Sequence, residues 1–255
     1  YNPPHDDDRL TRGGPLARTP SRLSGSLNVR SDGRRTTVGR LNYNWATEDG
    51  DSWSRSLSLN LTTNAGERLR LQLGPSVTRR HASAQYVTSV ADPLADRTFG
   101  RRYIFGSLDQ TTVSLETTIN FTFTSWLSLQ LYVEPFISTG NYRELKELER
   151  PGTFRFLEYG TDIGTVSQDP GASYSVDPDG PGPAAPFVVP DRDFSYRSLL
   201  GNAVLRWEWR PGSTLFLVWQ QSRISSLRGD GPKGTDPWIG GLDLSRDAGD
   251  MFGTP

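Results

Sequence analysis

The chain has 255 residues, a net charge of −1 at pH 7 and no cysteine, which excludes disulfides, thiolate metal sites and cysteine-based catalysis. The near balance of acidic and basic residues gives no strong field for recruiting nucleic acid, so we expect no nucleic-acid partner. No apolar run approaches the roughly 18 residues of a membrane-spanning helix. A membrane β-barrel is not excluded by this, because only alternate residues of its strands face lipid.

Residues 1–20 consist mainly of Pro, Asp, Arg and Gly with little periodicity, which predicts a linker or an irregular N-terminal segment. The first residues have neither the basic region nor the apolar core of a signal peptide, and the last, DAGDMFGTP, form a polar turn. We therefore expect a piece of a longer polypeptide in which residues 21–255 form one β domain.

Alternation of apolar and polar residues begins after residue 20 and predicts several strands before residue 80. The tripeptide Asn64-Ala65-Gly66 separates the last two of them and is typical of a hairpin turn. The predicted strands are SGSLNVR (24–30), TTVGRLNYNW (36–45), WSRSLSLNLTT (53–63) and RLRLQLGPSV (68–77).

Two further strands, at 84–90 and 101–108, flank a Pro- and Asp-containing loop. The next two, at 113–123 and 127–137, alternate strictly. Each keeps its alternation for about ten residues, whereas strands of soluble proteins average about five to six. That length suits a tilted strand that crosses a bilayer.

Residues 139–197 are rich in Pro, Gly and Asp, which predicts a long external loop. Within it, 143–150 could form a short helix and 153–159 a small strand. A second clear hairpin follows at 201–222 with its turn at 210–213, which brings the total to about ten strands.

The alternation gives the predicted sheet one apolar and one polar face. We expect the apolar residues to face lipid and the polar residues to line a water-filled lumen. The lipid-facing set is Leu115, Ile119, Phe121, Leu129, Leu131, Leu205 and Leu217. The lumen-lining set is Glu116, Asn120, Gln130, Glu134, Arg206 and Glu208.

Short turns at one end of the hairpins and long connections at the other are typical of outer-membrane barrels. Trp126, Trp207 and Trp209 lie beside the short turns, where indoles favour the membrane–water interface. The sequence therefore predicts an all-β, antiparallel, outer-membrane-type β-barrel, incomplete, with long extracellular loops. A soluble β-sandwich explains the alternation equally well, but the strand length and the loop asymmetry less well.

Several stretches resemble one bacterial family: RRYIFGSLDQTTVSL, FTSWLSLQLYVEPFISTGNY, FSYRSLLGNAVLRWEWRPGSTLFLVWQQS and the Gly-Asp-rich tail. The family consists of large uncharacterised proteins in which a module similar to family-9 carbohydrate-binding domains precedes a predicted outer-membrane barrel. The resemblance covers roughly residues 55–255 and implies a bacterial outer-membrane location with a link to glycan handling. The chain lacks the N-terminal module and a final apolar strand ending in an aromatic residue, which indicates truncation at both ends.

Chemical motifs are weak. The carboxylate pairs Glu116–Glu134 and Asp191–Asp193 could in principle hydrolyse a glycoside, but charge lining is the simpler interpretation. The loop acids Asp177, Asp179, Asp191 and Asp193 could bind Ca²⁺, although such spacing is common in turns. His5 lies in an acidic tract and His81 near a strand end, and residues 229–234 match a glycine-rich pattern without the helix it requires.

We therefore expect no catalytic residues, no metal and no cofactor. The predicted function is a non-enzymatic pore, anchor or surface-binding scaffold whose partners are the lipid bilayer and a polar solute or glycan. The alternatives are a soluble carbohydrate-binding β-sandwich and a glycoside hydrolase that uses the paired carboxylates.

Overall fold

The computed structural model describes residues 1–168 and 173–228, and strands make up most of this part of the chain. One short 3-10 helix, Asp96–Thr98, interrupts them. Every pairing between named strands is antiparallel. The predicted all-β antiparallel class is therefore confirmed.

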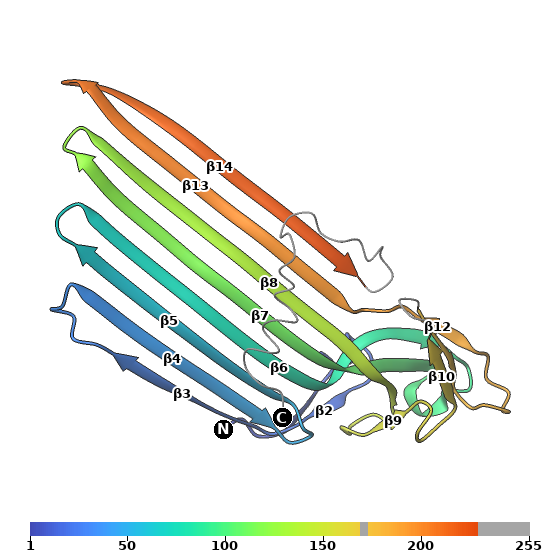
Figure 1. Ribbon diagram of the computed structural model, residues 1–255. Helices are drawn as coiled ribbons and strands as arrows, with labels where there is room; N and C mark the ends of the chain where they lie inside the picture. The colour runs from blue at the N-terminus through green and yellow to red at the C-terminus, as the bar shows by residue number, and fades with distance from the viewer. Residues whose placement is uncertain (169–172, 229–255) are drawn as a thin grey trace.

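Eight strands form one large sheet, in which their order follows the order along the chain (Figure 1). The strands β9 to β12 lie between β8 and β13 in sequence and interrupt this order. The spatial order is β14-β13-β8-β7-β6-β5-β4-β3, and a ninth strand, β9 (Phe156–Glu158), pairs with the far end of β8. The eight strands are β3 (Arg22–Arg30), β4 (Thr37–Glu48), β5 (Trp53–Ala65), β6 (Leu69–Ala91), β7 (Arg101–Thr124), β8 (Leu127–Leu148), β13 (Phe194–Arg210) and β14 (Ser213–Arg228).

The four hairpin turns β3–β4, β5–β6, β7–β8 and β13–β14 lie together at one end of the sheet, as Figure 1 shows. Gly66 and Gly212 adopt positive φ angles of 66° and 79° in two of these turns. A left-handed backbone costs glycine little, so these residues let the chain reverse sharply. The predicted turn at 210–213 is confirmed, whereas the turn predicted at 64–66 lies at 66–68, because Asn64 and Ala65 still pair with Arg70 and Leu69.

Two predicted strand pairs are each a single longer strand. Residues 68–77 and 84–90 both belong to β6, and 101–108 and 113–123 both belong to β7. The register of β6 against β7 shifts between Ala82 and Gln85 and again between Tyr86 and Thr88. Such bulges bend a strand without ending it, so the pairing continues where the sequence pattern changes.

The predicted helix at 143–150 is wrong over residues 143–148, which belong to β8. Lys146 and Glu147 pair with Phe105 and Ile104 of β7, and Leu145 is buried. Pairing and burial override the local helix propensity of RELKEL. The connection to β13 is therefore residues 149–193, and its predicted small strand is present as β9.

Beyond the hairpin-rich sheet, the extended ends of β6, β7 and β8 carry a packed cap. A two-stranded sheet is formed by β1 (His5–Asp7) and β2 (Ala17–Thr19), and a three-stranded sheet by β10 (Thr165–Gln168), β11 (Tyr174–Asp177) and β12 (Phe187–Val189). One buried cluster joins Ile104 to Val176 and Val189, and a second joins Tyr103 and Phe105 to Ala17. Burial on both sides explains why RRYIFGSL does not alternate.

The cap also changes the interpretation of two segments. Residues 1–20, predicted to be a linker, form β1 and β2 and bury Thr11 and Ala17. The long connection after β8 contributes Val176 and Val189 to a core. Both segments are therefore folded parts of the protein over their described residues, because their few apolar side chains have a surface to pack against.

The two edges of the large sheet, β3 and β14, do not pair with each other in the described part of the chain. The sheet is therefore open over these residues. No helix among the residues that the structure describes is long and apolar enough to cross a bilayer.

Candidate functional site

The strand register brings the seven predicted lipid-facing residues onto one face of the sheet. Leu129 pairs with both Phe121 and Leu205, and Leu205 pairs in turn with Leu217. Ile119 lies opposite Leu131 in the same way. Leu115 keeps the same alternation along β7.

This apolar face extends across all eight strands. On β3, Leu27 and Val29 are 57% and 52% exposed, and on β14 Leu217 is 65% exposed. Between these edges no second sheet or helix of the described residues covers the face (Figure 1). Contiguous exposed apolar surfaces are typical of sites that contact an apolar partner.

The six predicted lumen residues lie on the opposite, polar face. Asn120 pairs directly with Gln130, and Glu134 accepts a hydrogen bond from the Tyr132 hydroxyl at 2.6 Å. Glu116 keeps the same alternation on β7. The face is thus built of side chains that can hydrogen-bond to water or to each other.

Arg206 and Glu208 lie at the hairpin end of this face. Their side chains form an ion pair of 3.3 Å, and Glu208 also accepts the backbone N–H of Gly212. Trp126, Trp207 and Trp209 surround a shallow hollow of about 590 Å³ beside them, and each indole is about half exposed. The three tryptophans therefore gather at the end of the sheet where the sequence puts them.

The loop carboxylates considered for hydrolysis or for Ca²⁺ accept backbone hydrogen bonds. Asp193 accepts the backbone N–H of Tyr142 at 2.5 Å, and Asp191 accepts that of Asp193 at 2.9 Å. Asp177 and Asp179 accept backbone N–H groups of their own turn. Among the described residues no group of three or more His, Cys, Asp or Glu could hold a metal ion.

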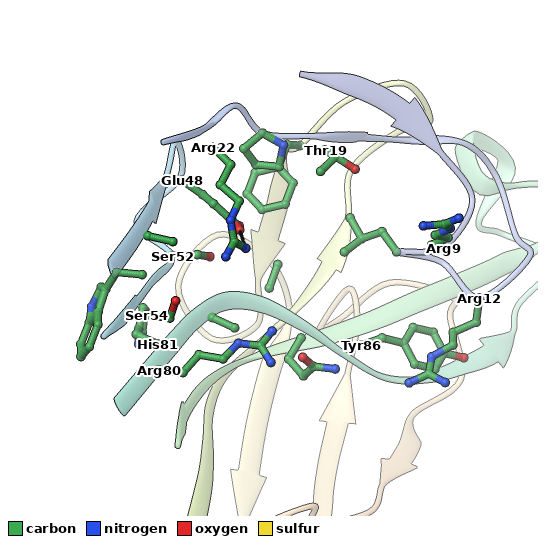
Figure 2. A pocket seen from close by; sticks show the side chains of 18 of the residues that line it. Arg9, Arg12, Thr19, Arg22, Glu48, Ser52, Ser54, Arg80, His81 and Tyr86 are labelled. Carbon is green, nitrogen blue, oxygen red and sulfur yellow. Dashed lines mark hydrogen bonds and ion pairs between the residues drawn. The ribbon is translucent and has the colours of Figure 1, made fainter. Parts of the chain in front are cut away.

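A pocket of about 880 Å³ lies at the opposite end of the sheet from the hairpin turns (Figure 2). Its floor comes from the ends of β4, β5 and β6, and the N-terminal segment before β3 encloses it together with Phe154. No pattern in the sequence indicates this site, because Arg9 and Arg12 belong to the predicted linker and Arg80 lies between the predicted strands at 68–77 and 84–90.

Positive charge dominates the pocket lining. Four arginines, Arg9, Arg12, Arg22 and Arg80, face two carboxylates, Asp8 and Glu48. Figure 2 shows the guanidinium groups of Arg22 and Arg80 directed into the same space from different strands. Of the four, Arg22 has an ion pair, with Glu48 at 2.9 Å.

Aromatic rings and hydroxyl groups complete the lining. The guanidinium of Arg12 lies over the Tyr86 ring, 5.5 Å from its centroid, which orients it by a cation–π contact. Ser52, Ser54 and Thr19 add hydroxyl groups to the wall. The pocket therefore combines charge, hydrogen-bonding groups and a flat apolar surface.

His81, which the sequence places near a strand end, is partly buried at the margin of this pocket. Its Nδ1 lies 2.7 Å from Asp109 Oδ1, and its ring stacks on Trp53. His5 lies far from it in sequence and contacts Asp7 at 3.5 Å. The two histidines thus each have a carboxylate neighbour.

A polar network ties the cap to the extended strands. Arg102 forms ion pairs with Asp92 at 2.6 Å and with Glu147 at 2.8 Å, and all three side chains are about nine-tenths buried. The Tyr159 hydroxyl donates to Glu147 at 2.6 Å. Burial and the neighbouring Glu147 carboxylate hold the pKa of Tyr159 well above its usual range. Burial alone would raise the pKa of Asp92, but the hydrogen bonds from Arg102 and from the Leu94 N–H outweigh it and lower that pKa.

These features define a class of protein: an antiparallel all-β chain with one apolar and one polar sheet face and a packed cap over one end. Residues 8–230 match a family described as a domain of unknown function (DUF5916), and the chain belongs to that family. No curated protein and no solved structure matched the chain. The predicted glycine-rich pattern at 229–234 lies outside the described residues, and the link to a carbohydrate-binding module stays a prediction.

Proposed function

We propose that the chain forms part of the wall of a bacterial outer-membrane β-barrel and acts without chemistry as a surface-binding scaffold. The apolar sheet face contacts lipid, and the polar face lines water. The hairpin turns lie on the periplasmic side, and the cap with its pocket lies outside the cell. A polar solute is the partner expected at the water-filled side.

The dimension of the apolar band carries this proposal. On β8 the band runs from Leu127 to Ile137, and on β7 from Val113 to Phe123. Ten steps of about 3.3 Å give roughly 33 Å of strand, which at a tilt of about 40° spans about 25 Å. That is the height of the apolar band on outer-membrane barrels. The tryptophans at the hairpin end lie where an interfacial girdle is expected.

A barrel wall in lipid has no unpaired strand edges, because hydrocarbon offers no partner for backbone N–H and C=O groups. The proposal therefore requires the free edges of β3 and β14 to pair with additional strands, either of another chain or of further segments of the same polypeptide. Edge strands with exposed apolar residues are prone to such pairing.

The soluble β-sandwich remains the competing structure, because a second sheet could cover the apolar face as well as lipid could. It differs in one measurable respect: a side chain in a sandwich core meets neither water nor acyl chains. The absence of cysteine makes this difference accessible, since a single introduced cysteine is a unique attachment point.

The test uses three adjacent cysteine variants of β8, Leu129→Cys, Gln130→Cys and Leu131→Cys, each labelled with a small fluorophore. The protein is refolded into phosphatidylcholine vesicles with or without bromine on the acyl chains. We expect brominated chains to quench the label at 129 and 131 and to leave that at 130 unchanged. A water-soluble quencher is expected to give the opposite pattern.

Gln130→Cys serves as the matched control, because it has the same depth and strand but the opposite face. Absence of quenching by brominated lipid at both 129 and 131 in folded protein would favour the sandwich and overturn the proposal. Equal quenching at all three positions would contradict the two-faced wall as well.

A further inference from the structure

We propose that the pocket between the N-terminal segment and the ends of β4, β5 and β6 binds a small organic anion with two or more carboxylate, phosphate or sulfate groups. This inference is independent of the membrane location, because every residue it uses belongs to the pocket. It assigns a ligand class to a site defined by geometry.

An excess of positive charge gathers in one partly open pocket. The chain as a whole has a net charge of −1, yet four arginines and two carboxylates line this pocket. Arginine stays protonated at any accessible pH. Like charges held together in a concave site repel one another, and a bound anion relieves that repulsion.

Few of these cations have an ion-pair partner in the described part of the protein. Within residues 1–168 and 173–228, no carboxylate lies within 4.0 Å of the charged nitrogens of Arg9, Arg12 or Arg80, in contrast to Arg22 and its partner Glu48. Arg12 is held against the Tyr86 ring face, which leaves the edge of its guanidinium available to donate. A guanidinium fork matches the paired oxygens of carboxylate, phosphate and sulfate groups.

The volume of the pocket and the neutral part of its lining also fit a small organic molecule. At about 880 Å³, the pocket is in the range of small-molecule sites, roughly 300–1,000 Å³, and far exceeds one inorganic anion. Ser54, Thr19 and Gln85 add groups that can bind hydroxyls, and Tyr86 and Phe154 add flat apolar surface. The lining therefore fits an organic anion with hydroxyl groups and a carbon skeleton.

The positions of the arginines explain why more than one anionic group is expected. Figure 2 shows Arg22 and Arg80 on one side of the pocket, and Arg12 with Tyr86 on the other. A ligand with a single charge would satisfy one side and leave the other uncompensated. Two anionic groups on one skeleton would reach both sides.

The experiment measures binding by isothermal titration calorimetry on the refolded full chain, with trigalacturonate, citrate and inorganic phosphate as anionic probes and neutral maltotriose as the comparison. We expect trigalacturonate or citrate to bind more tightly than phosphate by at least tenfold, and maltotriose not to bind. Affinity should fall as the salt concentration rises, because part of the interaction is between partly exposed charges.

Two variants test the residues. Arg80→Gln is expected to weaken the binding of the preferred anionic probe at least tenfold, and Arg12→Gln should do the same. Arg70→Gln is the matched control: Arg70 is also exposed on β6, about 33 Å along the strand at 3.3 Å per residue, and its loss should leave affinity unchanged. Because all three side chains are exposed, circular dichroism spectra should match the parent protein.

Three results would overturn the inference. One is a failure of every anionic probe to bind folded protein, and another is equal affinity for maltotriose. The third is an equal effect of Arg70→Gln and Arg80→Gln, which would indicate a general charge effect and no defined site. None of these results depends on how the cysteine labels respond to brominated lipid, so the two proposals can fail separately.

Discussion

An arginine in place of Leu131 would put a charge near the middle of the apolar band. Leu131 pairs with Ile119 on one side and Ala203 on the other, so an arginine there has no carboxylate among its direct cross-strand partners. Leu131 is four steps from Leu127, which at about 3.3 Å per step and a tilt of about 40° corresponds to a depth of about 10 Å in a band of about 25 Å.

At that depth an outward-facing arginine costs about 2–4 kcal/mol, whereas near the interface it costs about 0–1 kcal/mol. We therefore expect Leu131→Arg to lower the free energy of unfolding by about 2–4 kcal/mol and Ile137→Arg, at the end of the band, by about 0–1 kcal/mol. Gln130→Arg lies at the same depth but on the polar face. Its cost should be as small as that of Ile137→Arg, because its charge stays in water.

The assay is guanidinium unfolding of the protein in phosphatidylcholine vesicles, followed by tryptophan fluorescence and far-ultraviolet circular dichroism. Shorter acyl chains should reduce the cost at Leu131, because a thinner bilayer brings the arginine closer to water. Equal costs for Leu131→Arg and Gln130→Arg, or a cost at Leu131 that ignores acyl-chain length, would refute the assignment of this face to lipid.

The cap supplies three further predictions. Glu147→Gln removes one partner of the buried network and leaves the charge of Arg102 incompletely compensated. It should destabilise the cap by about 3–5 kcal/mol in thermal unfolding. The control variant Arg101→Gln removes an exposed contact with Ser89 and should cost less than about 1 kcal/mol. Because the folded state lowers the pKa of Asp92, its contribution is present above the unfolded value of about 3.9 and is lost as pH falls through the lower folded value; unfolding followed from pH 6 to pH 2 should show this loss, and Asp92→Asn should abolish that part of it. Gly164→Ala forces a Cβ against the Asp177 carbonyl at a positive φ of 49° and should cost more than about 1 kcal/mol, whereas Gly66→Ala, with open space around it, should cost about 1 kcal/mol from backbone strain alone.

The faces of the sheet were predictable because side-chain direction in a strand depends only on position along it. Leu129, Gln130 and Leu131 alternate by geometry, so their sides follow from the sequence without knowledge of their neighbours. Short turns were predictable for a similar reason, since Gly66 and Gly212 supply a backbone conformation locally. These features require no information from distant parts of the chain.

The cap and its pocket could not be predicted in this way. The bulges near Ala82 and Tyr86 carry β6 past the point where its alternation changes, and nothing local indicates that the strand continues. Arg9 and Arg80 line one pocket, although about seventy residues separate them in the chain, because the N-terminal segment folds back over the strand ends. Long-range packing decided each case, as it did for residues 143–148, whose composition favours a helix.

The two edge strands of the sheet, β3 and β14, differ in the side chains that they carry on the polar face. On β3 that side carries Ser24, Ser26 and Asn28, whose polar groups can hydrogen-bond to water. On β14 it carries Phe216, Val218 and Ile224, each about 60% exposed over the described residues, so over residues 215–219 apolar side chains lie on both faces of this strand. Exposure of both faces of this segment to solvent would be costly, so in the proposed wall we expect the inner side of β14 at Phe216 and Val218 to lie against apolar material. In the proposed wall, the water-lined part then runs from β3 to β13, which includes the predicted lumen residues of β8 and β13, and the arginine pocket lies at its end away from the hairpin turns. If the proposed wall is correct, a solute that enters from the cap side would meet these arginines before the rest of the polar face.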